Sequence, residues 1–242
     1  MEKQSIAELL SENTYPGRGI LIGQSADGAF AVAAYFIMGR SENSRNRVFH
    51  ESGGEVTIFP YDVTKVKDPS LIIYTPVRRI GNSLIVTNGD QTDTIYEYLL
   101  RGHTFEYALI TRKYEPDAPN FTPRISGIID FTDNGFTYKL SILKRAPESP
   151  LSCGNEGACQ RFTYTYEPIP GTGHLIHTYK CDGNPIPSFI GEPRAVAIDC
   201  GIDDFASLLW DSLNADNKVS LYVSYTDIKT GEQTIRIKNK NE

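Results

Sequence analysis

Arginine, carboxylate and amide side chains gather in three short stretches of this 242-residue chain, each at the end of an apolar run. The stretch 87–94, Thr-Asn-Gly-Asp-Gln-Thr-Asp-Thr, separates a strand-like run at 83–86 from a helix-like run at 95–101. A helix that begins there would offer unpaired backbone N–H groups to an anion or a polar small molecule. Helix capping by Asp90 or Thr92 is the plainer interpretation of the same residues.

The other two stretches carry side chains that suit an anionic ligand. The stretch 39–47 holds three arginines within eight residues, namely Arg40, Arg45 and Arg47. Guanidinium groups bind phosphate through paired hydrogen bonds, although a solvated loop has the same composition. The stretch 114–124 is rich in proline, which is unfavourable inside a helix, and leads into an apolar run. Because rigid scaffolds commonly present site residues on such loops, we expect the three stretches to meet at one cleft.

Each single candidate also has a structural interpretation. Tyr74 could present its hydroxyl to a cleft, or it could lie in the core with that hydroxyl satisfied. Glu115 could transfer a proton or be a surface carboxylate. Arg124 could bind an anion or form an ion pair with a nearby carboxylate. Asn88 and Asn120 suit recognition of base or carboxamide edges, and equally suit ordinary turns.

The elements that must position these residues are mostly strands. Apolar or alternating runs of strand length lie at 20–23, 30–37, 56–59, 71–74, 84–86, 126–131, 136–143, 161–166, 175–179, 195–198, 220–225 and 234–237. Turn signals at Asp27-Gly28, Gly81-Asn82 and Asn134-Gly135 indicate antiparallel hairpins. Helical patterns lie near the N-terminus and at 92–101, 104–112 and 203–213. Many strands with segregated helices predict an α+β fold with packed sheets.

In their order along the chain, these motifs resemble the archaeal-type IMP cyclohydrolase family, enzymes that make the last ring closure of purine synthesis. The matching residues are Gly17-Arg18-Gly19, Arg40-Ser41 to Asn46-Arg47, Ile73-Tyr74, Asn88-Gly89 with Thr92-Asp93-Thr94, and Tyr114-Glu115-Pro116-Asp117 to Asn120 and Thr122-Pro123-Arg124-Ile125. Two departures are Phe121, inserted between Asn120 and Thr122, and a longer arginine stretch. The resemblance covers residues 15–145, and no family motif follows from residue 146.

The resemblance implies a four-layer αββα sandwich of the Ntn-hydrolase-like type, with antiparallel sheets. It implies one domain over residues 1–242, in which 146–242 completes or extends the fold. The substrate would be a formamidoimidazole-carboxamide ribotide, a ribonucleotide, which is closed to IMP with loss of water and without a cofactor or metal. The implied catalytic residues are Arg40, Tyr74 and Glu115. The residues expected to bind the ribotide are Arg18, Arg45, Asn46, Arg47, Asn88, Asp90, Thr92, Asn120 and Arg124.

Two other functions stay open at this point. One is a nucleotide-binding protein that keeps the pocket without the chemistry, and the other is an amidohydrolase that acts on a different amide. Ntn hydrolases use a processed N-terminal Cys, Ser or Thr, and we see no equivalent residue here, which argues against a covalent mechanism of that kind.

Composition limits the partners and the compartment. A formal net charge of -6 gives no general electrostatic support for binding nucleic acid. No apolar run approaches the roughly 20 residues that a membrane-spanning helix needs. The N-terminus shows no basic leader before an apolar core, so we expect a cytoplasmic protein with free thiols at Cys153, Cys159, Cys181 and Cys200. Zinc and disulfides are the alternatives, but Cys-x5-Cys fits no common zinc site. Self-association into a homo-oligomer is left open.

Overall fold

Strands β1 (Arg18–Gln24) and β2 (Phe30–Met38) show how the sequence builds a sheet with two apolar faces. The computed structural model describes residues 3–66, 73–133, 135–147 and 157–241. The two strands pair antiparallel, and successive side chains point to opposite faces. Ile20 and Tyr35 therefore lie in the core between two sheets, whereas Leu21 and Phe36 pack against helices.

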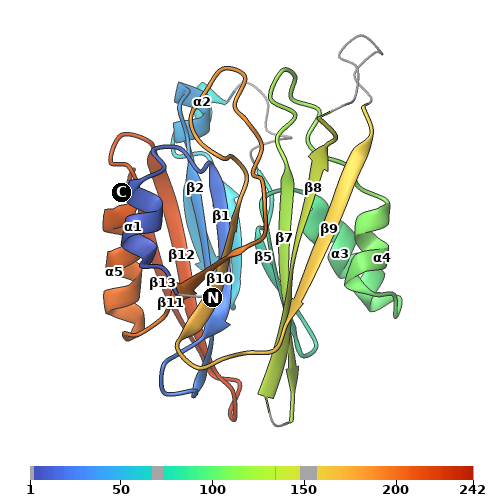
Figure 1. Ribbon diagram of the computed structural model, residues 1–242, viewed down its shortest axis with the longest axis vertical. Helices are drawn as coiled ribbons and strands as arrows, with labels where there is room; N and C mark the ends of the chain where they lie inside the picture. The colour runs from blue at the N-terminus through green and yellow to red at the C-terminus, as the bar shows by residue number, and fades with distance from the viewer. Residues whose placement is uncertain (1–2, 67–72, 134, 148–156, 242) are drawn as a thin grey trace.

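These strands lie at the centre of a six-stranded sheet with the order β11-β10-β1-β2-β12-β13. The other four strands come from the C-terminal part of the chain: β10 (Thr172–His177), β11 (Arg194–Ala197), β12 (Lys218–Asp227) and β13 (Gln233–Asn239). Its outer face is covered by helices α1 (Ile6–Ser11) and α5 (Ile202–Ser212) (Figure 1).

The second sheet has seven strands in the order β3-β4-β5-β6-β7-β8-β9. Its strands are β3 (Val48–Ser52), β4 (Glu55–Phe59), β5 (Val77–Ile80), β6 (Ser83–Thr87), β7 (Arg124–Thr132), β8 (Gly135–Arg145) and β9 (Cys159–Tyr166). Helices α3 (Gln91–Leu100) and α4 (Phe105–Ile110) pack on its outer face through Ile95, Phe105 and Leu109. The short helix α2 (Glu42–Arg45) and a 3-10 turn (Val63–Lys65) lie in the connections that flank β3 and β4.

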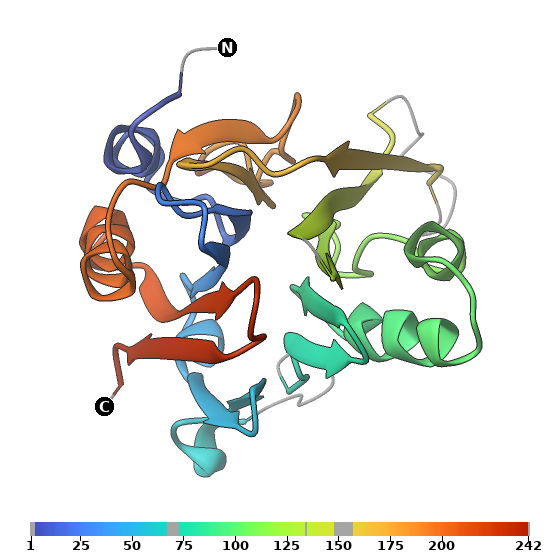
Figure 2. The ribbon, with the colours of Figure 1, turned by 90° about the horizontal axis from the view of Figure 1, so that it is seen from below.

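The two sheets face each other across one apolar core, with a helical layer outside each of them (Figures 1 and 2). The named strands pair only antiparallel with one another. The predicted α+β class with antiparallel sheets is therefore confirmed. In the described ranges, no helix is long and apolar enough to cross a membrane.

Most predicted elements are present, and the differences are local. The strand predicted at 175–179 ends at His177, because Tyr179 forms only an isolated bridge with Ser188. The strand predicted at 71–74 lies partly outside the described residues, and Tyr74 is not in a strand although its carbonyl accepts a hydrogen bond from the Ile58 N–H. Asn134 of one predicted turn and Cys153 also lie outside the described residues. The thiols of the three described cysteines are free.

Candidate active site

The two glycines of Gly17-Arg18-Gly19 bring the start of β1 into close contact with its neighbours. Gly17 has φ +80, and a Cβ there would lie 2.3 Å from Thr178 Oγ1. A Cβ on Gly19 would lie 2.2 Å from the Phe36 ring. Only glycine fits both contacts, and at Gly17 only glycine adopts that backbone readily. Arg18, between them, shares the strand face of Ile20 and so points between the sheets.

Arg18 is a cation whose Nε–H donor is left without a partner among the described residues. It keeps some solvent-accessible surface, but this Nε is buried. Burial lowers the pKa of Arg18, but the Glu115 carboxylate and the phenols of Tyr179, Tyr74 and Tyr35 raise it more, so the net pKa lies well above its usual value. The guanidinium therefore stays charged and can donate to a bound anion.

Arg47 adds a second guanidinium beside the first. It lies just after α2, is 2% exposed, and donates from Nε to the Ser44 carbonyl at 2.8 Å and from Nη2 to the Met38 carbonyl at 3.3 Å. Burial and the charge of Arg18 lower the pKa of Arg47. Two buried like charges repel each other, so an anion between them would be favoured.

Two tyrosines lie beside these arginines, one on β2 and one on the segment that precedes β5. The hydroxyl groups of Tyr35, on β2, and Tyr74 lie 2.8 Å apart, and both side chains are buried. Burial raises the pKa of Tyr74, an effect that the charges of Arg18 and Arg47 partly oppose. The pair therefore stays protonated at neutral pH and offers a hydroxyl donor beside the two guanidinium groups.

Glu115 supplies the carboxylate of this cluster. It is 5% exposed, and its N–H donates to the Thr122 carbonyl at 2.9 Å. Burial raises the pKa of Glu115, while the positive charges of Arg18 and Arg124 oppose this rise. A carboxyl group with a raised pKa exchanges protons more readily near neutral pH, which suits general acid–base chemistry.

The turn between β6 and α3 is fastened to β7 by its own side chains. Asn88 donates to the Pro123 carbonyl at 2.9 Å and accepts from the Ile125 N–H at 2.8 Å. Thr92 donates to the Gly89 carbonyl at 2.9 Å. Both side chains are buried with these partners, so the hydrogen bonds favour the turn interpretation for Asn88 and Thr92.

Asp90 does not cap α3 with its side chain, contrary to the capping interpretation. Its carboxylate pairs instead with Arg124 Nη1 at 2.6 Å and with Arg112. Arg124 Nη1 also donates to Gln91 Oε1 at 2.7 Å. This network holds the buried Arg124 next to the Glu115 carboxylate. The positive charge of Arg124 opposes the rise in the Glu115 pKa that burial causes.

Arg40 and Arg45 lie outside the buried cluster. Arg40 is half-exposed, pairs with Asp182 at 2.5 Å, and its guanidinium carbon lies 5.0 Å from the Tyr15 ring centroid. Arg45 donates to the Gly39 carbonyl at 2.9 Å and to Asn217 at 3.2 Å. Of the three arginines in the stretch 39–47, Arg47 is buried, and the other two are exposed.

Asn46 and Asn120 hold loops at this end of the molecule. The side chain of Asn46 donates to the Asp62 carbonyl at 2.7 Å and accepts from the Asp62 N–H at 2.7 Å. Asn120 accepts from the Ile186 N–H at 3.1 Å and so ties the 115–123 loop to the connection between β10 and β11. Both side chains thus shape the surroundings of the cluster through backbone partners.

Tyr35, Thr122 and Tyr179 belong to the cluster but were not predicted from the sequence. Tyr35 could have been found, because it shares a strand face with Ile37 and lies opposite Ile20 of β1, two residues from Arg18. Tyr179 lies in the segment without a recognised motif, and nothing in its local sequence marks it.

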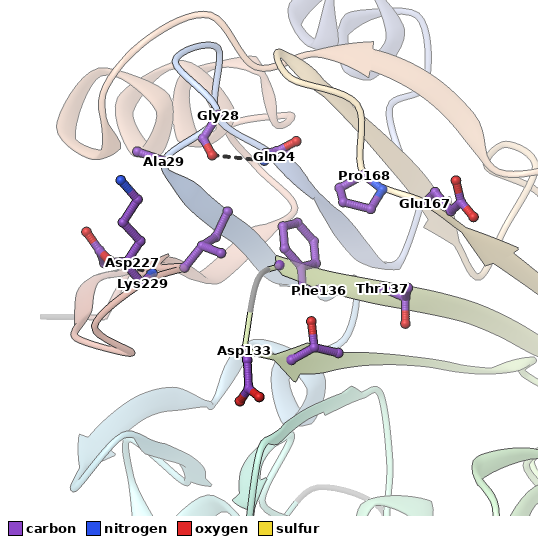
Figure 3. A pocket seen from close by; sticks show the side chains of 13 residues that line it. Gln24, Gly28, Ala29, Asp133, Phe136, Thr137, Glu167, Pro168, Asp227 and Lys229 are labelled. Carbon is purple, nitrogen blue, oxygen red and sulfur yellow. Dashed lines mark hydrogen bonds between the residues drawn. The ribbon is translucent and has the colours of Figure 1, made fainter.

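A surface pocket of about 730 Å³ lies at the other end of the sandwich (Figure 3). Its lining includes Gln24 and Lys229, and Gln24 is at the opposite end of β1 from Arg18. Gln24 donates to the Gly28 carbonyl at 2.9 Å, and Asp227 accepts from the Lys229 N–H at 2.8 Å. Because Gln24 and Asp227 serve local turns, and the buried cluster around Arg18 groups guanidinium, carboxyl and hydroxyl side chains, we take the cluster as the better candidate.

Comparisons with known proteins found one family model and several relatives. The model of a family described as IMP cyclohydrolase-like protein matches residues 15–232. The IMP cyclohydrolase of Methanopyrus kandleri is 31% identical over 169 residues, 68% of this chain and 75% of the relative. That of Methanococcus aeolicus is 30% identical over 145 residues, 58% of this chain and 70% of the relative. That of Methanosphaera stadtmanae is 35% identical over 129 residues, 50% of this chain and 61% of the relative. The family match continues past residue 146, where the motifs recognised in the sequence had ended.

Proposed function

The chain belongs to the IMP cyclohydrolase-like family, and on that premise we propose that the buried cluster around Arg18 is the active site of an IMP cyclohydrolase. The reaction is the dehydrative closure of 5-formamidoimidazole-4-carboxamide ribotide to IMP. The observation that supports this site is the grouping of the Arg18 and Arg47 guanidinium groups, a buried carboxyl group and a tyrosine pair between the sheets.

The reaction requires transfer of a proton from the carboxamide nitrogen and stabilisation of negative charge on the formyl oxygen. The carboxamide nitrogen bonds to the formyl carbon, and the proton it gives up ends on the formyl oxygen, which becomes a hydroxyl. This hydroxyl leaves as water with the proton of the former formamido nitrogen while a C=N bond forms. Both reacting groups belong to one molecule, so holding them together in the right orientation supplies much of the rate increase.

The residues of the cluster match these demands. Glu115, with its pKa raised by burial, takes the proton from the carboxamide nitrogen. Arg18 and Tyr74 donate to the formyl oxygen as negative charge develops on it. Arg47 contributes positive charge for the anionic ribotide, and Arg40 lies at the rim as a second phosphate ligand. With two arginines and one glutamate, the centre carries excess positive charge, which favours an anionic substrate.

We also assign the fold to the Ntn-hydrolase-like type and treat the described chain as one domain. Two antiparallel sheets between two helical layers support the type, and chain segments from before and after residue 146 pair within both sheets. No processed nucleophile enters the proposed mechanism, because the carboxamide nitrogen of the substrate is itself the nucleophile.

Turnover of the formylated ribotide tests this function through the ultraviolet absorbance change that accompanies purine formation. In Tyr74→Phe the ring stays and one hydroxyl donor is lost, so kcat should fall about 100- to 1000-fold with stability nearly intact. Tyr107→Phe, on the exposed surface of α4, is the matched control and should turn over normally. Tight binding of the ribotide without turnover by the wild type would instead indicate a nucleotide-binding protein, and hydrolysis of simple amides would indicate an amidohydrolase.

A further inference from the structure

Tyr179 packs directly on the segment that presents Arg18. A Cβ on Gly17 would lie 2.5 Å from the Tyr179 ring, so the ring lies against the backbone next to Arg18. The Tyr179 N–H donates to the Pro16 carbonyl at 3.2 Å, and the Arg18 N–H donates to Thr178 Oγ1 at 3.1 Å. The segment 178–179 is therefore fastened to the start of β1 by hydrogen bonds and packing.

The same tyrosine reaches the loop that presents Glu115. Its hydroxyl lies 2.6 Å from Thr122 Oγ1, and that pair is buried. The Thr122 carbonyl accepts the Glu115 N–H at 2.9 Å, and the Thr122 N–H donates to Asp117 Oδ1 at 2.6 Å. Thr122 also donates its hydroxyl proton to the Asp117 carboxylate, so its oxygen is left to accept a hydrogen bond from the Tyr179 hydroxyl.

We propose that Tyr179 is a positioning residue for ring closure, which holds Glu115 at its working position relative to Arg18 by acting through Thr122. The inference rests on the proposed function. It concerns the hydroxyl group alone, because the ring has a separate structural role in its stack with Tyr15, at 5.8 Å between centroids. A misplacement of about 1 Å between reacting groups can cost on the order of 100-fold in rate.

Tyr179→Phe removes the hydroxyl and keeps the stacked ring. We expect kcat to fall on the order of 10- to 100-fold while KM changes little, because orientation rather than binding is lost. The limb of the pH–rate profile that Glu115 controls should move to higher pH, since a carboxyl group that drifts from Arg18 loses a charge that lowers its pKa. Thr122→Val should reproduce both effects, whereas Thr122→Ser, which keeps the hydroxyl, should behave like the wild type. The double variant with Tyr179→Phe and Thr122→Val should be no less active than the less active of the two single variants. Tyr107→Phe is the control.

A titration of the Glu115 carboxyl by carbon NMR, assigned with Glu115→Gln, separates this inference from the proposed function, because it needs no turnover. A higher Glu115 pKa in Tyr179→Phe and Thr122→Val than in the wild type supports the inference even if the substrate differs. An unchanged Glu115 pKa in both variants overturns it, as does a loss of activity that only follows a loss of thermal stability. If the two variants show the higher Glu115 pKa but the wild type does not close the ribotide, the proposed function is overturned and the positioning role of Tyr179 is not.

Discussion

Replacing Arg18 by methionine should separate activity from stability more sharply than any other change in the cluster. Methionine keeps an unbranched side chain of similar reach and removes the guanidinium. Because the Arg18 Nε has no partner among the described residues, few bonds within the protein are lost. The repulsion that lowers the Arg47 pKa also disappears, and Glu115 keeps Arg124 and Arg47 as counter-charges.

The expected magnitudes differ for folding and for catalysis. The lost attraction to Glu115 and the relieved repulsion from Arg47 oppose each other, so the free energy of unfolding should change by about 1 kcal/mol or less, the usual size for changes without a broken bond network. In the transition state, hydrogen bonds from a charged donor are worth about 1.5–3 kcal/mol each. Two such bonds from Arg18 amount to about 3–6 kcal/mol, which is on the order of 100- to 10,000-fold in kcat/KM.

The measurement pairs ribotide turnover with urea unfolding of the same preparation. Arg236→Met is the matched control. Arg236 lies on the edge strand β13 and forms a largely exposed ion pair with Asp203 of α5. A loss of more than about 3 kcal/mol of stability would show that Arg18 closes a buried ion pair, as is typical when one partner of such a pair is removed. Turnover within threefold of the wild type would show that Arg18 is not the donor that stabilises the formyl oxygen.

Three further changes test the surroundings of the cluster. Burial raises the pKa of Glu115 above 4.5, so the free energy of unfolding of the wild type should fall as pH rises from 4.5 through that raised pKa. In unfolding experiments across pH, Glu115→Gln should lack this slope. The same variant should be inactive. Burial lowers the pKa of His177 from 6.5 to about 4, so neutral His177 should contribute about 3 kcal/mol to the free energy of unfolding above pH 6.5. This contribution should be lost as pH falls towards 4. An acid unfolding curve of His177→Gln that matches the wild type would contradict this. Gly19→Ala would place a Cβ 2.2 Å from the Phe36 ring and should lower stability by about 1–3 kcal/mol together with activity. Gly135→Ala, where a Cβ would meet nothing within 4 Å, should lower neither in thermal unfolding and turnover assays.

The strands were predictable because their apolar alternation is a local property. In β12, for example, Leu221, Val223 and Tyr225 alternate along the strand and pack on the face that the helices cover. The pairing order was not predictable, because β1 lies between β2 and β10, and the second of these neighbours is about 150 residues away along the chain. No local pattern specifies such a partner.

The candidate site was predictable where a motif carries its residues. Tyr74 and Glu115 do lie together in the interior, with Arg47 from the arginine stretch. The sequence could not distinguish Arg47 from Arg40, because their difference depends on where the chain turns after β2. It could not indicate Tyr179 at all, since that residue enters the cluster only through the pairing of β10 with β1.

The central position of the β1–β2 hairpin has a consequence for how the protein forms during its synthesis. Both outer edges of this hairpin are completed late, one by β10 and the other by β12, which ends at Asp227. The stretch of chain that holds the family motifs therefore leaves the ribosome long before its sheet can close, and it exposes two unpaired strand edges in the meantime. Contacts this distant in sequence slow folding, because the loop between them must close first. A nascent chain arrested near residue 146 should thus be protease-sensitive and unable to bind the ribotide, and one released beyond β12 should gain both protection and binding together.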